Sequence, residues 1–243
     1  MKVEVIGTGA IYTKYHSACT LIDEELMVDM PNGTLKQLLR NQYQPEKIRT
    51  ILITHKHGDH MADLPFFLKY VQAYLYDMTN SKDEITIIGP KGIEEKVIQL
   101  FEAYSFESRE EIQEGMKIKY IELEQEEQEI EVHNYEVQAW QVSHGEEKPA
   151  YGYVINQSVG CTGDSKLCDN VEKIVENSKI TIADTSLIKG DNCHMGMNNI
   201  KYLTQKYKKP IIATHMRDKT RETLQKEENA NILVVEDGYQ FYV

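Results

Sequence analysis

The chain has 243 residues, 41% of them apolar, which is enough to bury the core of one large α/β domain. Its 39 acidic and 27 basic residues give a formal net charge of −12, which argues against a basic nucleic-acid-binding surface. No apolar run approaches the roughly 20 residues of a membrane span, and "MKVEVIGTGA" lacks the pattern of a signal peptide, so we expect a cytosolic protein with no membrane partner.

Strand and helix patterns alternate along the chain. The predicted strands are 2–6, 19–28, 50–54, 85–89, 117–123, 130–142, 151–156, 180–184, 210–214 and 232–242. The predicted helices are 33–41, 61–78, 92–103, 167–177, 197–208 and 220–226. "HN" at 133–134 suits a bend between strands, and "EDGY" at 236–239 suits the turn of a final hairpin. So many strands favour two stacked sheets flanked by helices, in a single α/β domain over residues 1–243.

Two smaller features leave their interpretation open. "GTGA" at 7–10 is either a tight turn or a backbone loop that lines a nearby site, because it lacks both the GxGxxG and the Walker patterns. The four cysteines have no CxxC spacing in a chain too long to need disulfides, so we expect them to be reduced.

The stretch "THKHGDH" at 54–60 is the strongest chemical signal in the sequence. Residues two apart on a strand point the same way, so we expect His55 and His57 to project together from the end of "RTILIT". Gly58 permits a sharp turn that brings Asp59 and His60 to the same point. One short segment then offers ligands to two neighbouring metal ions.

Two ions need more ligands than these four, and other predicted strand ends supply them. They are His144 in "VSHG", Asp164 in "CTGDS" and His215 in "IIATH". Imidazole and carboxylate ligands without thiolate favour two divalent ions, Zn²⁺ first, with Mn²⁺ or Fe²⁺ as alternatives.

The order of these motifs resembles the metallo-β-lactamase superfamily, which implies an αββα sandwich with a dinuclear site at one edge. In that family pattern, one ion is held by His55, His57 and His144. The second is held by Asp59, His60 and His215, and Asp164 bridges the two.

Further stretches resemble the ribonuclease Z branch: "GTGA", "HGDHMADLP", "ITIIGPKGI", "SHGEEKPAYGYVI", and "ADTSL" followed by "HMG" and "ATHMR". The resemblance implies that His194 protonates the leaving oxygen, that Asp184 orients it, and that Asp59 belongs to the catalytic set as well as to the ligands. The chain departs from the family pattern in having Asp at the usual Glu position and Met195 after the histidine.

The interval between His144 and Asp164 bears on the substrate. Ribonuclease Z enzymes that mature tRNA usually carry a long basic arm there, but a turn and two strands use up this interval. The chain therefore resembles small phosphodiesterases such as the anti-Pycsar enzymes, which implies a 3′,5′-cyclic mononucleotide as the small-molecule substrate, hydrolysed to the nucleoside monophosphate.

Two groups of side chains are candidates for contacting such a substrate. Tyr70, Tyr74 and Tyr76 could stack on the base, although their helical spacing is more typical of core or interface residues. The basic stretch 201–226 could bring Arg217 or Arg221 near a phosphate.

Three alternatives stay open on sequence grounds. The first is a tRNA 3′ endonuclease of the ribonuclease Z type, and the second is a thioester or lactone hydrolase of the glyoxalase II kind, which could use the same ligands. The third is a binding protein that has lost turnover. The resemblance also implies a homodimer.

Overall fold

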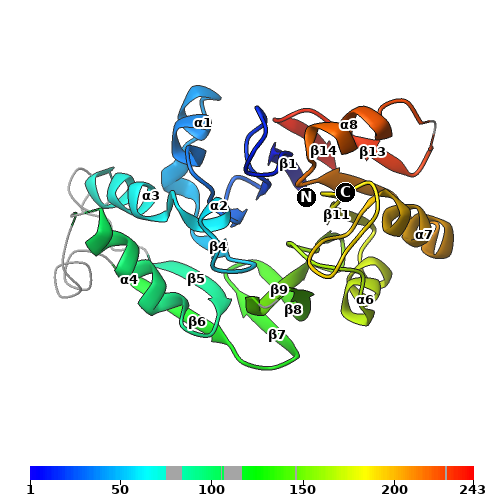
Figure 1. Cartoon of the computed structure of the whole chain (residues 1–243). Helices are drawn as coiled ribbons and strands as arrows, with labels where there is room; N and C mark the ends of the chain where they lie inside the picture. Colours follow the sequence, from blue (N-terminus) through cyan, green and yellow to red (C-terminus); the bar gives the residue numbers. More distant parts are fainter. Residues whose placement is uncertain (75–83, 105, 107–116, 146, 228) are drawn as a thin grey trace.

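Two seven-stranded β-sheets stack against each other, with helices on their outer sides (Figure 1). The computed structural model describes residues 1–74, 84–104, 106, 117–145, 147–227 and 229–243. This arrangement confirms the predicted two stacked sheets flanked by helices.

The first sheet is built mainly from the N-terminal half. Its strands are β1 (Lys2–Gly7), β2 (Cys19–Ile22), β3 (Leu26–Val28), β4 (Thr50–Leu52), β5 (Ile85–Pro90), β6 (Ile118–Leu123) and β14 (Tyr239–Tyr242), in the spatial order β14-β1-β2-β3-β4-β5-β6. The associated helices are α1 (Thr34–Arg40), the 3₁₀ turn η1 (Pro45–Lys47), α2 (Gly58–Met61), α3 (Leu64–Val71) and α4 (Ile93–Ala103).

The second sheet is built from the C-terminal half. Its strands are β7 (Glu127–Val132), β8 (Tyr135–His144), β9 (Glu147–Ile155), β10 (Val159–Cys161), β11 (Ile180–Asp184), β12 (Ile211–Thr214) and β13 (Ile232–Val234), in the order β13-β12-β11-β10-β9-β8-β7. Its helices are α6 (Asp169–Asn177), α7 (Met197–Tyr207) and α8 (Asp218–Leu224).

Alternation along the strands separates three apolar layers. Ile51 and Ile53 pack under the helices of the first sheet, whereas Leu52 faces the core between the sheets. On the second sheet, Val154 packs towards the helices and Tyr153 and Ile155 face the inter-sheet core. The period of two predicted from the sequence therefore builds the layers.

Two details of the predicted elements are wrong. Ile232–Val234 and Tyr239–Tyr242 do not form a hairpin, because β13 pairs with β12 in the second sheet and β14 pairs with β1 in the first. The "EDGY" turn instead crosses from one sheet to the other. The strand predicted over 50–54 ends at Leu52, so His55 and His57 lie in a loop.

Each sheet is parallel on one side, and the carboxyl ends of these parallel strands carry the predicted site. In the first sheet β3 and β4 run parallel, and in the second β10, β11 and β12 do. Loops after such strand ends form the usual ligand-binding edge of a sheet. Within the described residues, no helix is both long and apolar enough to cross a membrane.

Candidate metal centre

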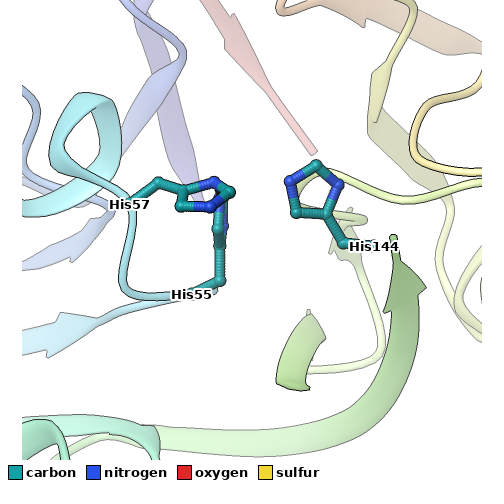
Figure 2. A group of neighbouring side chains, drawn as sticks. All are labelled: His55, His57 and His144. Atoms are coloured by element: carbon teal, nitrogen blue, oxygen red, sulfur yellow. Dashed lines mark hydrogen bonds between the residues drawn. The ribbon is translucent and has the colours of Figure 1, made fainter. Parts of the chain in front are cut away.

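All seven predicted ligands meet at this edge. His55 and His57 are presented by the loop after β4, and His144 by the end of β8, with their rings facing one another (Figure 2). Asp59 and His60 lie on α2. The loop brings His55 and His57 together without the strand geometry expected from the sequence, since His55 Nε2 and His57 Nδ1 are 2.9 Å apart.

Two special backbone conformations position the remaining ligands. Gly163, just before Asp164, has φ +58°, and a Cβ there would lie 2.8 Å from the Cβ of Thr54, so the turn requires glycine. His215 follows β12 with φ +53°, an uncommon conformation for histidine that marks a locally constrained site. Gly58 has neither a positive φ nor a close neighbour, so the sharp turn assigned to it is wrong.

Asp164 is the centre of the cluster. Its Oδ2 lies 3.3 Å from Nε2 of His215, 3.4 Å from that of His60, 3.9 Å from that of His55 and 4.0 Å from that of His144. Donor atoms about 2.0–2.1 Å from one tetrahedral ion lie roughly 3.3 Å apart, so these separations suit shared cations better than direct hydrogen bonds. The donors include two separate ligand sets, His55–His57–His144 and Asp59–His60–His215, and a third group, His55–His60–Asp164, shares one histidine with each of them.

The outer nitrogens of two ligands already have protein acceptors. Nδ1 of His60 donates to Asp29 Oδ2 at 2.8 Å, and Nδ1 of His144 donates to the carbonyl of Cys193 at 2.9 Å. These bonds leave each Nε2 as a lone pair directed at the cluster, the tautomer that a metal ligand needs. The buried Nε2 of His60 has no hydrogen-bond partner among the described residues.

Ser186 fixes the tautomer of His215 by accepting a hydrogen bond from its Nδ1. Its Oγ lies 2.7 Å from His215 Nδ1 and donates to Asp184 Oδ1 at 2.7 Å, so Nδ1 of His215 is the donor of that pair. The donor set, its orientation and the unpartnered Nε2 together fit divalent metal ions.

The electrostatics agree with this fit. Burial lowers the pKa of His60, but the adjacent carboxylates of Asp164 and Asp29 outweigh burial and raise it well above its ordinary value. Burial raises the pKa of Asp164, but His215, His60 and His55 hold it well below its ordinary value. The carboxylates therefore stabilise positive charge at His60, whereas burial and the neighbouring histidines hold the pKa of His55 well below its ordinary value.

The predicted proton donor lies next to the ligands. His194 Nδ1 is 2.8 Å from Asp184 Oδ2, and its ring stacks on that of His215 with centroids 5.3 Å apart. Burial lowers the pKa of His194, but the hydrogen bond and charge of Asp184, with the charges of Asp164 and Asp191, raise it to about 9. A cationic imidazole held by a carboxylate can donate a proton at neutral pH.

Sequence reasoning missed two residues of the site. Asp29, buried at the end of β3 with φ +60°, accepts hydrogen bonds from His60 and from the backbone and hydroxyl of Thr54. Ser186 links Asp184 to His215. An acid that ends an apolar strand, as in "LMVDM", could have pointed to Asp29, whereas nothing in "ADTSL" distinguishes Ser186 from other serines.

Several weaker candidates lie elsewhere. Tyr70 and Tyr74 are partly buried, pack against the core under the first sheet and stack on each other, so packing accounts for their positions. Tyr76 lies outside the described residues. Arg221 is buried against Tyr15 and Thr8 and not exposed to a phosphate, whereas Arg217 is exposed.

A family model described as "Anti-Pycsar protein Apyc1" matches residues 1–240. The sequence is 32% identical over 165 residues to ribonuclease Z of Pediococcus pentosaceus, covering 65% of this chain and 49% of that enzyme. The chain thus spans about half the length of that curated relative.

Two solved structures show the same fold. The metallo-β-lactamase fold protein YhfI of Bacillus subtilis has a TM-score of 0.76 at 18% identity, covering 99% of this chain and 98% of that one. The short form of human tRNase Z has a TM-score of 0.75 at 19% identity, covering 100% and 99%. These similarities confirm the predicted superfamily and its ribonuclease Z-like branch, together with the αββα fold. At the level of the superfamily, they also confirm the prediction of a metal-dependent hydrolase.

Proposed function

The chain belongs to the anti-Pycsar protein Apyc1 family, and from that premise we propose that it hydrolyses a 3′,5′-cyclic mononucleotide to the nucleoside monophosphate at a centre of two divalent metal ions. One observation carries the proposal: Nε2 atoms of four histidines lie within 4.0 Å of Asp164 Oδ2. Such a convergence of buried ligand atoms is costly unless cations compensate it.

Each ligand has a proposed place. His55, His57 and His144 would hold one ion and Asp59, His60 and His215 the other, and Asp164, whose Oδ2 lies near both groups, would contribute to both. The imidazole and carboxylate donors favour Zn²⁺, with Mn²⁺ and Fe²⁺ as alternatives. When bound, such ions would supply an activated water as the nucleophile and would stabilise negative charge on phosphoryl oxygens.

Side chains of the protein protonate the leaving group. Asp184 accepts the Nδ1 proton of His194, which fixes the ring and leaves its Nε2–H to donate to the departing ribose oxygen. Ser165 N and Ser186 N donate to the Asp184 carboxylate and hold it in place. Because water is the nucleophile, the reaction needs no serine or cysteine nucleophile.

The surface around the site supports a small substrate. The interval from His144 to Asp164 consists of β9 and β10 and their turns, so its described residues form no arm. In the basic stretch 201–226, Lys201 pairs with Glu227 and Lys206 with Glu172. Charge that is already paired within the protein adds little to binding a chain of phosphates.

A second candidate function is tRNA 3′ processing. It is favoured by the identity to ribonuclease Z of Pediococcus pentosaceus and opposed by the net charge of −12. A thioester or lactone hydrolase would use the same ligands and is the third candidate.

A substrate panel tests the proposal. Protein loaded with Zn²⁺ or Mn²⁺ is incubated with 3′,5′-cyclic mononucleotides of each base, a precursor tRNA and S-lactoylglutathione, and the products are separated by chromatography. We expect turnover of a cyclic nucleotide, its loss in His57→Ala, and no loss in His133→Asn, a matched change at an exposed histidine in the β7–β8 turn. Cleavage of the precursor tRNA alone would replace the proposal with the second candidate.

A further inference from the structure

The loop after β1, residues 8–17, displays two apolar side chains to solvent. Tyr12 is 90% exposed and Ile11 is 51% exposed, whereas the residues on which the loop rests, Thr8, Gly9, Ala10 and Ser17, are buried. A tyrosine ring this exposed gains almost nothing from the protein core. Its position calls for another explanation.

This loop borders the candidate metal centre. Ala10 N donates to the carbonyl of Met216 at 3.1 Å, and Met216 N donates to the carbonyl of Thr8 at 3.1 Å. Met216 directly follows the ligand His215, so the loop is fastened to the ligand's own chain segment. In the view of Figure 1 the dark-blue loop after β1 lies between α1 and α8.

Tyr12 is close enough to the ligands to reach a bound nucleotide. It lies two residues beyond Ala10, which limits the separation of their Cα atoms to about 7.6 Å. The base of a mononucleotide stands one ribose away from the phosphorus that the metal centre would hold. The chain connection from His215 through Met216 and Ala10 therefore keeps Tyr12 within the distance that a bound mononucleotide spans.

The base of the loop is tightly packed. A Cβ on Gly9 would lie 2.3 Å from Thr13 Oγ1 and 2.7 Å from Tyr15 Cβ, so the packing of the loop leaves no room for a side chain at this position. Thr13 N donates to the carbonyl of Ala10, which forms a turn around Ile11 and Tyr12. The exposed pair thus forms the tip of a compact turn.

Contacts from distant segments hold the loop in place. The guanidinium carbon of Arg221 lies 3.8 Å from the centroid of the Tyr15 ring, and its Nη2 donates to Thr8 Oγ1. Asp237 accepts hydrogen bonds from Thr8 N at 2.9 Å and from His16 N at 2.7 Å. A tip on such a support binds a ligand without first being ordered, which lowers the entropic cost of binding.

We propose that Tyr12, with Ile11 beside it, is the platform on which the base of the cyclic nucleotide stacks. The inference rests on the proposed function and adds the residue that contacts the base. Stacking accepts any base because every base has a π-face, so Tyr12 contributes affinity and leaves discrimination between bases to other contacts. It also gives the "GTGA" motif a role, since that turn supports a loop beside the site.

Kinetics with and without a base test the platform. Tyr12→Ala is compared with wild type, Tyr12→Trp and the control Tyr242→Ala, whose side chain is 79% exposed on β14. The substrates are the cyclic nucleotide and the 3,5-cyclic phosphate of methyl β-ribofuranoside, in which a methoxy group replaces the base. We expect Tyr12→Ala to raise KM for the nucleotide about tenfold or more, with kcat nearly unchanged.

The other combinations of variant and substrate should show no rise in KM. Tyr12→Ala should leave kcat/KM for the base-free substrate unchanged, and Tyr12→Trp and Tyr242→Ala should retain the wild-type KM for the nucleotide. If Tyr12→Ala is active and its KM for the nucleotide is unchanged, the proposed role of Tyr12 is wrong and the proposed function stands. Equal losses on both substrates, or a change of oligomeric state measured by light scattering, assign Tyr12 to the fold or an interface and also overturn the proposed role. If wild type hydrolyses no cyclic nucleotide, the proposed function falls, and the platform with it.

Discussion

One hydrogen bond distinguishes His194 from the proposed metal ligands. This residue lies among five other histidines and contacts a ligand ring, yet its Nδ1 is bound to Asp184, and its side chain is 16% exposed. A partly exposed histidine whose Nδ1 is held by a carboxylate is suited to proton transfer.

His194→Ala should lower kcat about 10²–10⁴-fold, the range for loss of a general acid, without changing the metal content. Steady-state kinetics and elemental analysis of the same preparation check both parts. A proportional loss of metal would instead make His194 a ligand, since its Nδ1 also lies 3.9 Å from Asp164.

Asp184→Asn should move the alkaline limb of the pH–rate profile to lower pH. Asp184 raises the pKa of His194, whose protonated form is the acid, so removing the charge lets that form be lost at lower pH. The profile of kcat is measured with matched metal loading and unchanged circular dichroism. An alkaline limb that does not shift would show that Asp184 does not set the pKa of the general acid.

The sequence predicted the site best where a residue's chemistry is unusual for its position. Histidines and aspartates at strand ends stand out, so all seven ligand candidates and His194 could be found. The partners of Asp29 and Ser186 could not be predicted, because each acts through a histidine 29–31 residues away in sequence, and only the folded chain brings them together.

At the scale of elements, the sheets were predictable from apolar alternation, whereas the chain's path between them was not. "EDGY" has the composition of a hairpin turn, but Asp237 bonds to Thr8 and His16 in the first sheet's loop. This pairing with a distant segment outweighs the local preference for a hairpin. The strand that leads to His55 is likewise shortened, because Thr54 N donates to Asp29 Oδ1 and not to a neighbouring strand.

Glycines that allow close packing of elements give a prediction at this scale. A Cβ on Gly152 in β9 would lie 2.5 Å from Ile174 Cδ1 of α6 and 2.9 Å from the carbonyl oxygen of Cys161. Gly152→Ala should therefore lower the free energy of unfolding by about 1–3 kcal/mol.

Gly58→Ala is the matched control, since a Cβ there meets nothing within 4 Å. It should change the free energy of unfolding by no more than about 0.5 kcal/mol. Urea denaturation of both variants measures the difference. Equal stabilities would contradict the packing of α6 on β9.

For the whole molecule, charge separates the candidate substrates. A net charge of −12 disfavours binding of a polynucleotide, and in the basic stretch 201–226 Lys201 and Lys206 are already paired with glutamates. KM for the cyclic nucleotide should change less than about threefold between 50 and 200 mM KCl, whereas binding through 6–10 phosphates would weaken about 10³–10⁵-fold. A steep salt dependence would favour tRNA.

The fold as a whole assembles ligands spread from His55 to His215 by stacking two sheets whose parallel ends open on the same side. The most direct test is anomalous diffraction from a crystal of the wild-type protein grown with Zn²⁺. The account predicts two zinc peaks per chain, one among His55, His57 and His144 and one among Asp59, His60 and His215, with Asp164 touching both. Peaks elsewhere, or none in this cluster, would contradict it.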